Sequence, residues 1–145
     1  MPDALLPDEG IGQQLECILQ RTVSGVLPWN LMLWVNDIVP DTDIVLADLV
    51  EATFGGYSQV TLTRSDWTTP DVHDGCAHST WMITPTVWNV TSGPTETPYG
   101  YAYIDVTAGV IRFIQRFDTP DIAPVVVGGK VSLLPTYTLT SAPCP

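Results

Sequence analysis

The fold class is decided by residues 99–117, which read YGYAYIDVTAGVIRFIQRF and predict a β-hairpin. Tyrosines at positions 99, 101 and 103 alternate with smaller residues, the two-residue period of a strand with two different faces. Thr107-Ala108-Gly109 then predicts a three-residue loop, in which Gly109 takes the left-handed conformation that such a loop with a bulge requires. The chain returns in a second strand that starts at Val110.

The second strand of this hairpin also alternates between two faces. Simple alternation predicts that Ile111, Phe113 and Phe117 share one face and that Arg112, Ile114 and Arg116 share the other.

Outward from the hairpin, β-branched runs that are interrupted by proline and glycine predict further short strands. They cover residues 31–36, 58–64, 79–90 with a break at Pro85, and 125–140 with a break at Gly128-Gly129. About seven short antiparallel strands in one domain are typical of a β-sandwich or jelly roll. We therefore expect a mainly β protein, with an antiparallel sandwich or jelly-roll-like domain over residues 28–145.

Residues 1–27 are predicted to form an arm and an amphipathic helix. Between Glu9 and Val23, apolar residues follow the spacing of one helical stripe, namely Ile11, Leu15, Ile18 and Leu19. Before this helix, Leu5 and Leu6 lie in a short segment between Pro2 and Pro7. We expect arm and helix to contact neighbouring subunits; the alternative for the helix is that its stripe packs on the β domain of the same chain.

Composition restricts the possible partners. The 145 residues contain sixteen acidic and five basic side chains, which gives a formal net charge of −11. Such a chain repels phosphate backbones and anionic lipid, so we expect no nucleic-acid partner and no membrane partner. No apolar run approaches the roughly 20 residues that a membrane-spanning helix needs.

Two clusters could carry metal chemistry. If residues 74–78 are extended, Asp74, Cys76 and His78 point to one face, as metal ligands or a Cys/His pair would. The favoured alternative is a turn at Asp74-Gly75 followed by a strand with a small apolar cysteine. Five acids between residues 37 and 51 offer oxygen ligands, but their spacing does not fit an EF-hand and a solvated acidic face explains them better.

No catalytic motif stands out in the chain. The nucleophile, zinc-protease, phosphate-loop and dinucleotide patterns are missing from the sequence, and two histidines and one lysine leave few candidates for a general base. We therefore expect a protein that is not an enzyme and that needs no cofactor and no metal.

Trp67 is the best candidate for a partner-binding aromatic residue. Its neighbours from Thr63 to Asp71 are polar, and an indole in a polar loop either folds back onto the core or anchors a partner. The candidate partner-binding residues are thus Leu5, Leu6, Ile11 and Trp67.

Several segments resemble a pattern found in small structural proteins of tailed bacteriophages. They are LMLWVNDIVP at 31–40, LADLVEA at 46–52, FGGY at 54–57, the Tyr-Gly-Tyr strand, RFD at 116–118 and YTLTS at 137–141. The likeness covers about residues 29–141 and implies a location in the virion, with no catalytic residues to transfer.

The resemblance leads to a specific expectation. It predicts a head decoration (cement) protein on the capsid exterior, whose partners are the major capsid protein and further copies of itself in an oligomeric arrangement. The alternatives are a tail, baseplate or adsorption component, or a carbohydrate-binding module. Both would use Trp67 and the tyrosines of strand 99–103 as contact residues.

Overall fold

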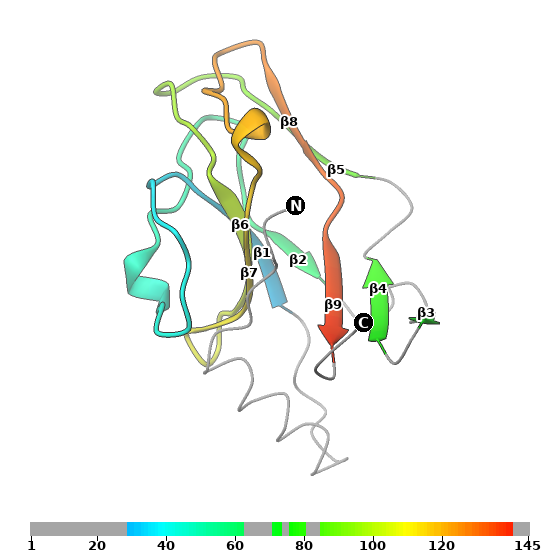
Figure 1. Ribbon diagram of the computed structural model, residues 1–145. Coiled ribbons are helices and arrows are strands. Elements are labelled where there is room, and N and C mark those ends of the chain that lie inside the picture. The colour runs from blue at the N-terminus through cyan, green and yellow to red at the C-terminus, as the bar shows by residue number, and fades with distance from the viewer. Residues whose placement is uncertain (1–28, 63–70, 74–75, 81–84, 141–145) are drawn as a thin grey trace.

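The computed structural model describes residues 29–62, 71–73, 76–80 and 85–140 of the chain (Figure 1). The described part is mainly β, its sheets are antiparallel, and its helical elements are two 3-10 turns at Leu46–Asp48 and Thr119–Asp121. The strands are β1 (Trp29–Trp34), β2 (Val60–Leu62), β3 (Asp71–His73), β4 (Cys76–Thr80), β5 (Thr86–Asn89), β6 (Gly100–Asp105), β7 (Val110–Arg116), β8 (Lys130–Leu133) and β9 (Thr136–Thr140).

A four-stranded sheet in the order β2-β1-β6-β7 forms the centre of the protein. Strand β6 pairs with β1 on one side and with β7 on the other, and all six of its residues are buried. The predicted hairpin is confirmed, but Val106 belongs to the turn, which therefore spans four residues. Gly109 has a φ of 69° and its N–H donates to the carbonyl of Asp105 at 2.8 Å.

Both faces of this sheet are covered by apolar side chains. One face carries the first core cluster, which includes Leu31, Leu33, Tyr101, Tyr103 and Phe113. The opposite face carries the second core cluster, with Met32, Trp34, Ala102, Ile104, Ile111 and Ile114. Alternate residues of β1 and β6 thus enter different clusters, as the two-residue period predicts.

A β-bulge in the hairpin corrects the predicted faces of β7. Tyr103 pairs with Phe113 and Ile104 pairs with Ile111, so Arg112 is an extra residue with no partner of its own in β6. An extra residue shifts the alternation by one position. Ile111 therefore lies in the cluster of Ile114 rather than beside Phe113, and its predicted placement was wrong.

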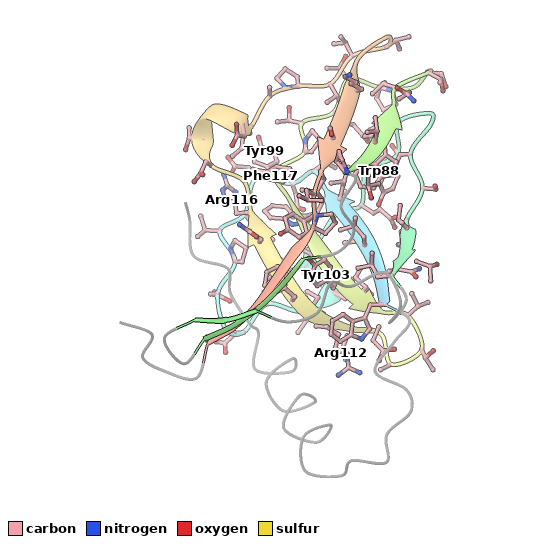
Figure 2. The ribbon with its side chains drawn as sticks, turned by 90° about the vertical axis from the view of Figure 1, so that its right-hand side faces the viewer. Trp88, Tyr99, Tyr103, Arg112, Arg116 and Phe117 are labelled. Atoms are coloured by element: carbon pink, nitrogen blue, oxygen red, sulfur yellow. The ribbon has the colours of Figure 1, made fainter. Side chains whose placement is uncertain are left out.

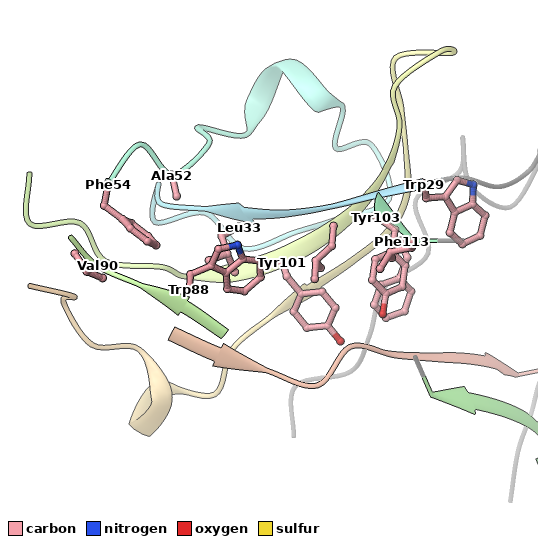
Figure 3. Packing of buried hydrophobic residues seen from close by; sticks show 11 residues of the cluster. Trp29, Leu33, Ala52, Phe54, Trp88, Val90, Tyr101, Tyr103 and Phe113 are labelled. Atoms are coloured by element: carbon pink, nitrogen blue, oxygen red, sulfur yellow. The ribbon is translucent and has the colours of Figure 1, made fainter. Parts of the chain in front are cut away.

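Each face of the central sheet is closed by a different part of the chain. The 35–52 loop covers the second cluster with Ile44 and Leu49. A two-stranded sheet, β5-β8, lies across the first cluster, where Trp88 of β5 faces Leu33 and Tyr101 (Figure 3). The Nε1–H of Trp88 donates to the carbonyl of Ser58 at 2.8 Å, so the indole packs without losing its hydrogen bond.

The remaining strands form a three-stranded sheet in the order β3-β4-β9. Strand β9 follows β8 after only two residues, so these two strands link the second and third sheets. The predicted strand regions at 58–64, 79–90 and 125–140 each contain a strand or part of one, whereas β3 was not predicted. The predicted arm and helix of residues 1–27 lie outside the described residues.

Candidate functional site

A groove of about 510 Å³ lies beside β8 and is the candidate binding site of the described part. Its lining is mostly apolar and comes from the end of the central hairpin, the 121–125 segment and β8. The lining residues are Pro98, Phe117, Asp121, Ala123, Pro124, Val125 and residues 130–134. The volume falls within the range of roughly 300–1,000 Å³ that small ligands or short peptide segments occupy.

A turn and an isolated β-bridge hold the segments that line the groove. The chain reverses at Val126, where the N–H of Gly129 donates to the carbonyl of Val126 at 2.8 Å and Gly128 has a φ of 89°. A positive φ at the third residue is the signature of a type II turn and favours glycine. On the other wall, the N–H of Val125 donates to the carbonyl of Glu96 at 2.7 Å.

The electrostatics of the groove differ from those of the whole chain. Lys130 and Asp121 line it, so its formal charge is zero while the chain carries −11. Arg112 pairs with Asp105 and Arg116 pairs with Asp37, whereas Lys130 forms no ion pair with any carboxylate of the described residues. The ammonium group of Lys130 is exposed and available to a ligand or partner.

The structure does not place the four predicted partner-binding residues. Leu5, Leu6, Ile11 and Trp67 lie outside the described residues, so these assignments stay predictions.

Two of the three tyrosines of strand 99–103 are buried and cannot contact a partner, whereas Tyr99 is half-buried. Tyr101 is 3% exposed and Tyr103 is fully buried, and both belong to the first core cluster (Figure 3). Tyr99 is stacked on Trp34 with ring centroids 6.3 Å apart and lies beneath the guanidinium of Arg116. These aromatic residues build the core, which leaves Trp67 as the aromatic candidate from the sequence.

The first candidate metal cluster is only partly described. Cys76 and His78 both lie on β4, where His78 pairs with Asp71 and Cys76 with His73, and Asp74 is outside the described residues. Within the described ranges no three histidine, cysteine or acidic side chains come close enough to hold a metal ion.

Asp41, Asp48 and Glu51 of the acidic 37–51 stretch accept hydrogen bonds that hold the fold. Asp41 accepts a hydrogen bond from the N–H of Asp43 at 3.0 Å, and Asp48 accepts one from the N–H of Val45 at 3.0 Å. Glu51 accepts hydrogen bonds from the hydroxyl of Tyr57 at 3.0 Å and from the side-chain amide of Gln59 at 2.9 Å. Burial, together with the nearby Glu51, raises the pKa of Tyr57 well above its usual value even though the N–H of Leu33 also donates to its hydroxyl.

Arg112 and Asp105 form a buried ion pair at the base of the β6–β7 hairpin. Their side chains are 5% and 10% exposed, and the Nη2 of Arg112 donates to Asp105. Among the described residues nothing accepts a hydrogen bond from the Nε or Nη1 of Arg112. Arg112 lies far from Tyr99, Arg116 and Phe117, at the opposite end of the central sheet (Figure 2).

The comparisons with known proteins assign no relative to this chain. No protein-family profile, no curated protein and no solved structure matches it. No helix in the described ranges has the length and apolarity needed to span a membrane. The patterns in the sequence did not single out the groove residues. A usable signal was present, because Lys130 is the single lysine of the chain and directly follows Gly128-Gly129.

The ion pair between Arg112 and Asp105 makes the free energy of unfolding depend on pH in the acidic range. Burial alone would raise the pKa of Asp105, but hydrogen bonds from Arg112 and from the N–H of Ala108 outweigh it, so the pKa lies below its ordinary value of 3.8. A lowered pKa adds stability above the unfolded-state pKa, and this stability is lost as the pH falls through the folded-state pKa. We expect the stability difference between the wild type and Asp105→Asn to shrink as the pH falls from about 5 to about 2.

Urea unfolding at several pH values, followed by tryptophan fluorescence, measures this difference. Asp37→Asn is the matched control, because the side chain of Asp37 is 65% exposed. If the two variants lose their stability difference from the wild type in the same way, the buried ion pair is not the source of the effect.

Proposed function

We propose that this protein is a structural component of a tailed-bacteriophage virion, most specifically a head decoration protein that binds the outside of the major capsid lattice. The proposal rests on the resemblance of residues 29–141 and on what the motif residues do in the fold. In this proposal the β5-β8 sheet and the central sheet are the two layers of a sandwich, and residues 1–27 are its attachment arm.

The observation that carries the proposal is that the motif residues are scaffold residues. Leu31, Leu33 and Trp34 of the first motif are fully buried on β1. Leu49 of the second motif is buried in the loop that closes over the second cluster, and Ala52 of the same motif is buried in the first cluster beside β1. The pattern therefore describes the central strand β1 and the loop that packs on it. This suits a family whose members share a structural core rather than a catalysed reaction.

The third motif holds the two layers together. A Cβ on Gly56 would lie 1.9 Å from the carbonyl oxygen of Asn89, and the N–H of Gly55 donates to the carbonyl of Ser92 at 2.7 Å. The carboxylate of Glu96 accepts two hydrogen bonds from Thr53 and one from the N–H of Phe54. These contacts join the segment after β5 to the segment after the cover loop, as a rigid domain on a pressurised shell requires.

A carbohydrate-binding module is less well supported. Such a module needs exposed aromatic rings, and the rings of Tyr101 and Tyr103 are buried among the core residues of the first cluster. A tail or baseplate location uses the same scaffold and is the alternative within the virion.

The test is to locate the protein in purified virions. With a gold-labelled antibody, we expect electron microscopy to show label over the whole head surface, in many copies per particle. The matched control is a virion preparation from a phage with the gene deleted. Label confined to the tail would reject the head assignment, and label in neither place would reject the virion proposal as a whole.

A further inference from the structure

The groove runs along an edge of β8. Residues 130–134 all line it, although side chains at successive strand positions point to opposite faces. A wall made of consecutive residues is therefore the edge of the strand. Among the described strands, β5 alone pairs with β8, so the other edge faces the groove.

A groove of this kind suits an extended peptide. An unpaired strand edge presents N–H and C=O groups in a row, and an added strand can hydrogen-bond to them. Apolar walls formed by Phe117, Val131 and Leu133 then receive alternate side chains of the peptide. Leu134, which is 44% exposed, extends the apolar surface at the end of β8.

We propose that this groove binds residues 3–6 of a second copy of the same chain as an added strand. The segment Asp3-Ala4-Leu5-Leu6 lies between Pro2 and Pro7, and proline cannot donate to a strand ladder. The prolines thus limit the added strand to four residues, which is the length of β8. Leu6 precedes Pro7 and is therefore biased towards an extended conformation.

Side-chain directions also agree with this occupant. Leu5 and Leu6 are adjacent, so in a strand they point to opposite sides. One of the two leucines therefore enters the apolar groove, whose lining includes the exposed Leu134. Each leucine that becomes fully buried adds a favourable contribution in proportion to the apolar surface that leaves water.

Charge complementarity supports an acidic segment at this place. The arm carries Asp3 and Asp8, and Lys130 has no carboxylate partner among the residues that the structure describes. Asp121 is the one acid that lines the groove, so an acidic arm meets less repulsion here than the net charge of the chain implies.

The position of the groove favours an arm from another copy. Asn30 pairs with Ile104 beside the β6–β7 turn, whereas Gly100 and Arg116 pair at the far end, next to Phe117. The chain thus enters the central sheet at the end opposite to the groove (Figure 2). The arm of the same chain would have to run back along the whole sheet to reach the groove, whereas the arm of a neighbouring copy does not. This self-association does not depend on where the protein lies in a virion.

The test is photo-crosslinking in the full chain. Leu5 is replaced by the photoreactive residue benzoylphenylalanine, and equal amounts of nitrogen-15-labelled and unlabelled protein are mixed, irradiated and analysed by mass spectrometry. We expect crosslinks from position 5 to residues 130–134, with about half of them joining a labelled to an unlabelled chain.

Two variants that each change the charge by −1 test the role of Lys130. Lys130→Gln removes the cation from the groove, and we expect the crosslink yield to fall about two- to fivefold, the range that corresponds to one exposed ion pair. Val106→Glu adds an acid at the opposite end of the sheet, at a residue that is 61% exposed, and should leave the yield unchanged. Circular dichroism checks that both variants fold.

Three results would overturn the proposal. Crosslinks that never join differently labelled chains would mean that the arm binds its own chain. Crosslinks that miss the groove residues would place the arm elsewhere. Equal effects of Lys130→Gln and Val106→Glu would show that only the net charge matters.

Discussion

Replacing Arg112 by methionine is expected to lower the free energy of unfolding by about 3–5 kcal/mol, because it leaves the carboxylate of Asp105 buried without its counter-charge. Asp105 is 7% exposed, and the hydrogen bonds that remain to it come from the backbone N–H groups of Thr107 and of Ala108, the latter at 2.9 Å. Chemical denaturation in urea, followed by tryptophan fluorescence, measures the change.

A double variant separates the ion pair from general damage to the core. In Arg112→Met with Asp105→Asn both charges are gone, and the amide oxygen can still accept from Ala108. We expect this double variant to lose only about 1–2 kcal/mol, because a buried pair replaced by neutral groups is often close to neutral in stability. A double variant that is as unstable as Arg112→Met alone would show that the length of Arg112, and not its charge, holds the bulge.

Arg116→Met is the matched control for Arg112→Met. Asp37, the partner of Arg116, has a side chain that is 65% exposed, so solvent screens this pair. Including the contact of Arg116 with the Tyr99 ring, we expect a loss of about 1 kcal/mol.

Replacing Gly56 by alanine is expected to lower the free energy of unfolding by about 3 kcal/mol or more. Two effects combine at this position. Gly56 has a φ of 92°, which side-chain-bearing L residues rarely adopt, and a Cβ would lie 1.9 Å from the carbonyl oxygen of Asn89. The clash is with backbone, so the end of β5 must move away from the 54–57 turn.

Gly128→Ala is the control that isolates the clash. Gly128 has a φ of 89°, almost the same as that of Gly56, but nothing lies within 4 Å of a Cβ built there. We expect its loss to be about 1–2 kcal/mol, the backbone strain alone. Thermal and urea unfolding of the two variants measure the difference, and equal losses would mean that the chain relieves the Asn89 contact at no cost.

In the central hairpin, the alternation of side chains along the sequence predicted the two faces of β6 correctly but not those of β7. Tyr101 and Tyr103 alternate with Ala102 and Ile104, and the structure places the two sets in different core clusters as expected. The same rule failed for Ile111, because the bulge at Arg112 changes the phase of the alternation. The sequence predicted a bulge only at Gly109 in the loop, and no pattern signalled the extra residue at Arg112, because its position depends on how the two strands pair.

Tyrosine side chains show the limit of reading function from residue type. Tyr101 and Tyr103 were candidates for contact with a host or a sugar, yet both faces of β6 are covered. That coverage comes from β5-β8 on one side and from the 35–52 loop on the other, and both lie far from β6 in sequence. Periodicity identifies two faces of a strand but not whether solvent reaches either of them.

The sequence by itself determined the mainly β class, most strand regions and the central hairpin. These properties depend on the local alternation of side chains and on the positions of proline and glycine, which are local features of the chain. Tertiary structure alone decided the bulge, the burial of the tyrosines and the groove between β8 and the 121–125 segment. Each of these depends on the pairing or packing of residues distant in the chain, and the free energy of such contacts is a property of the pair rather than of either segment.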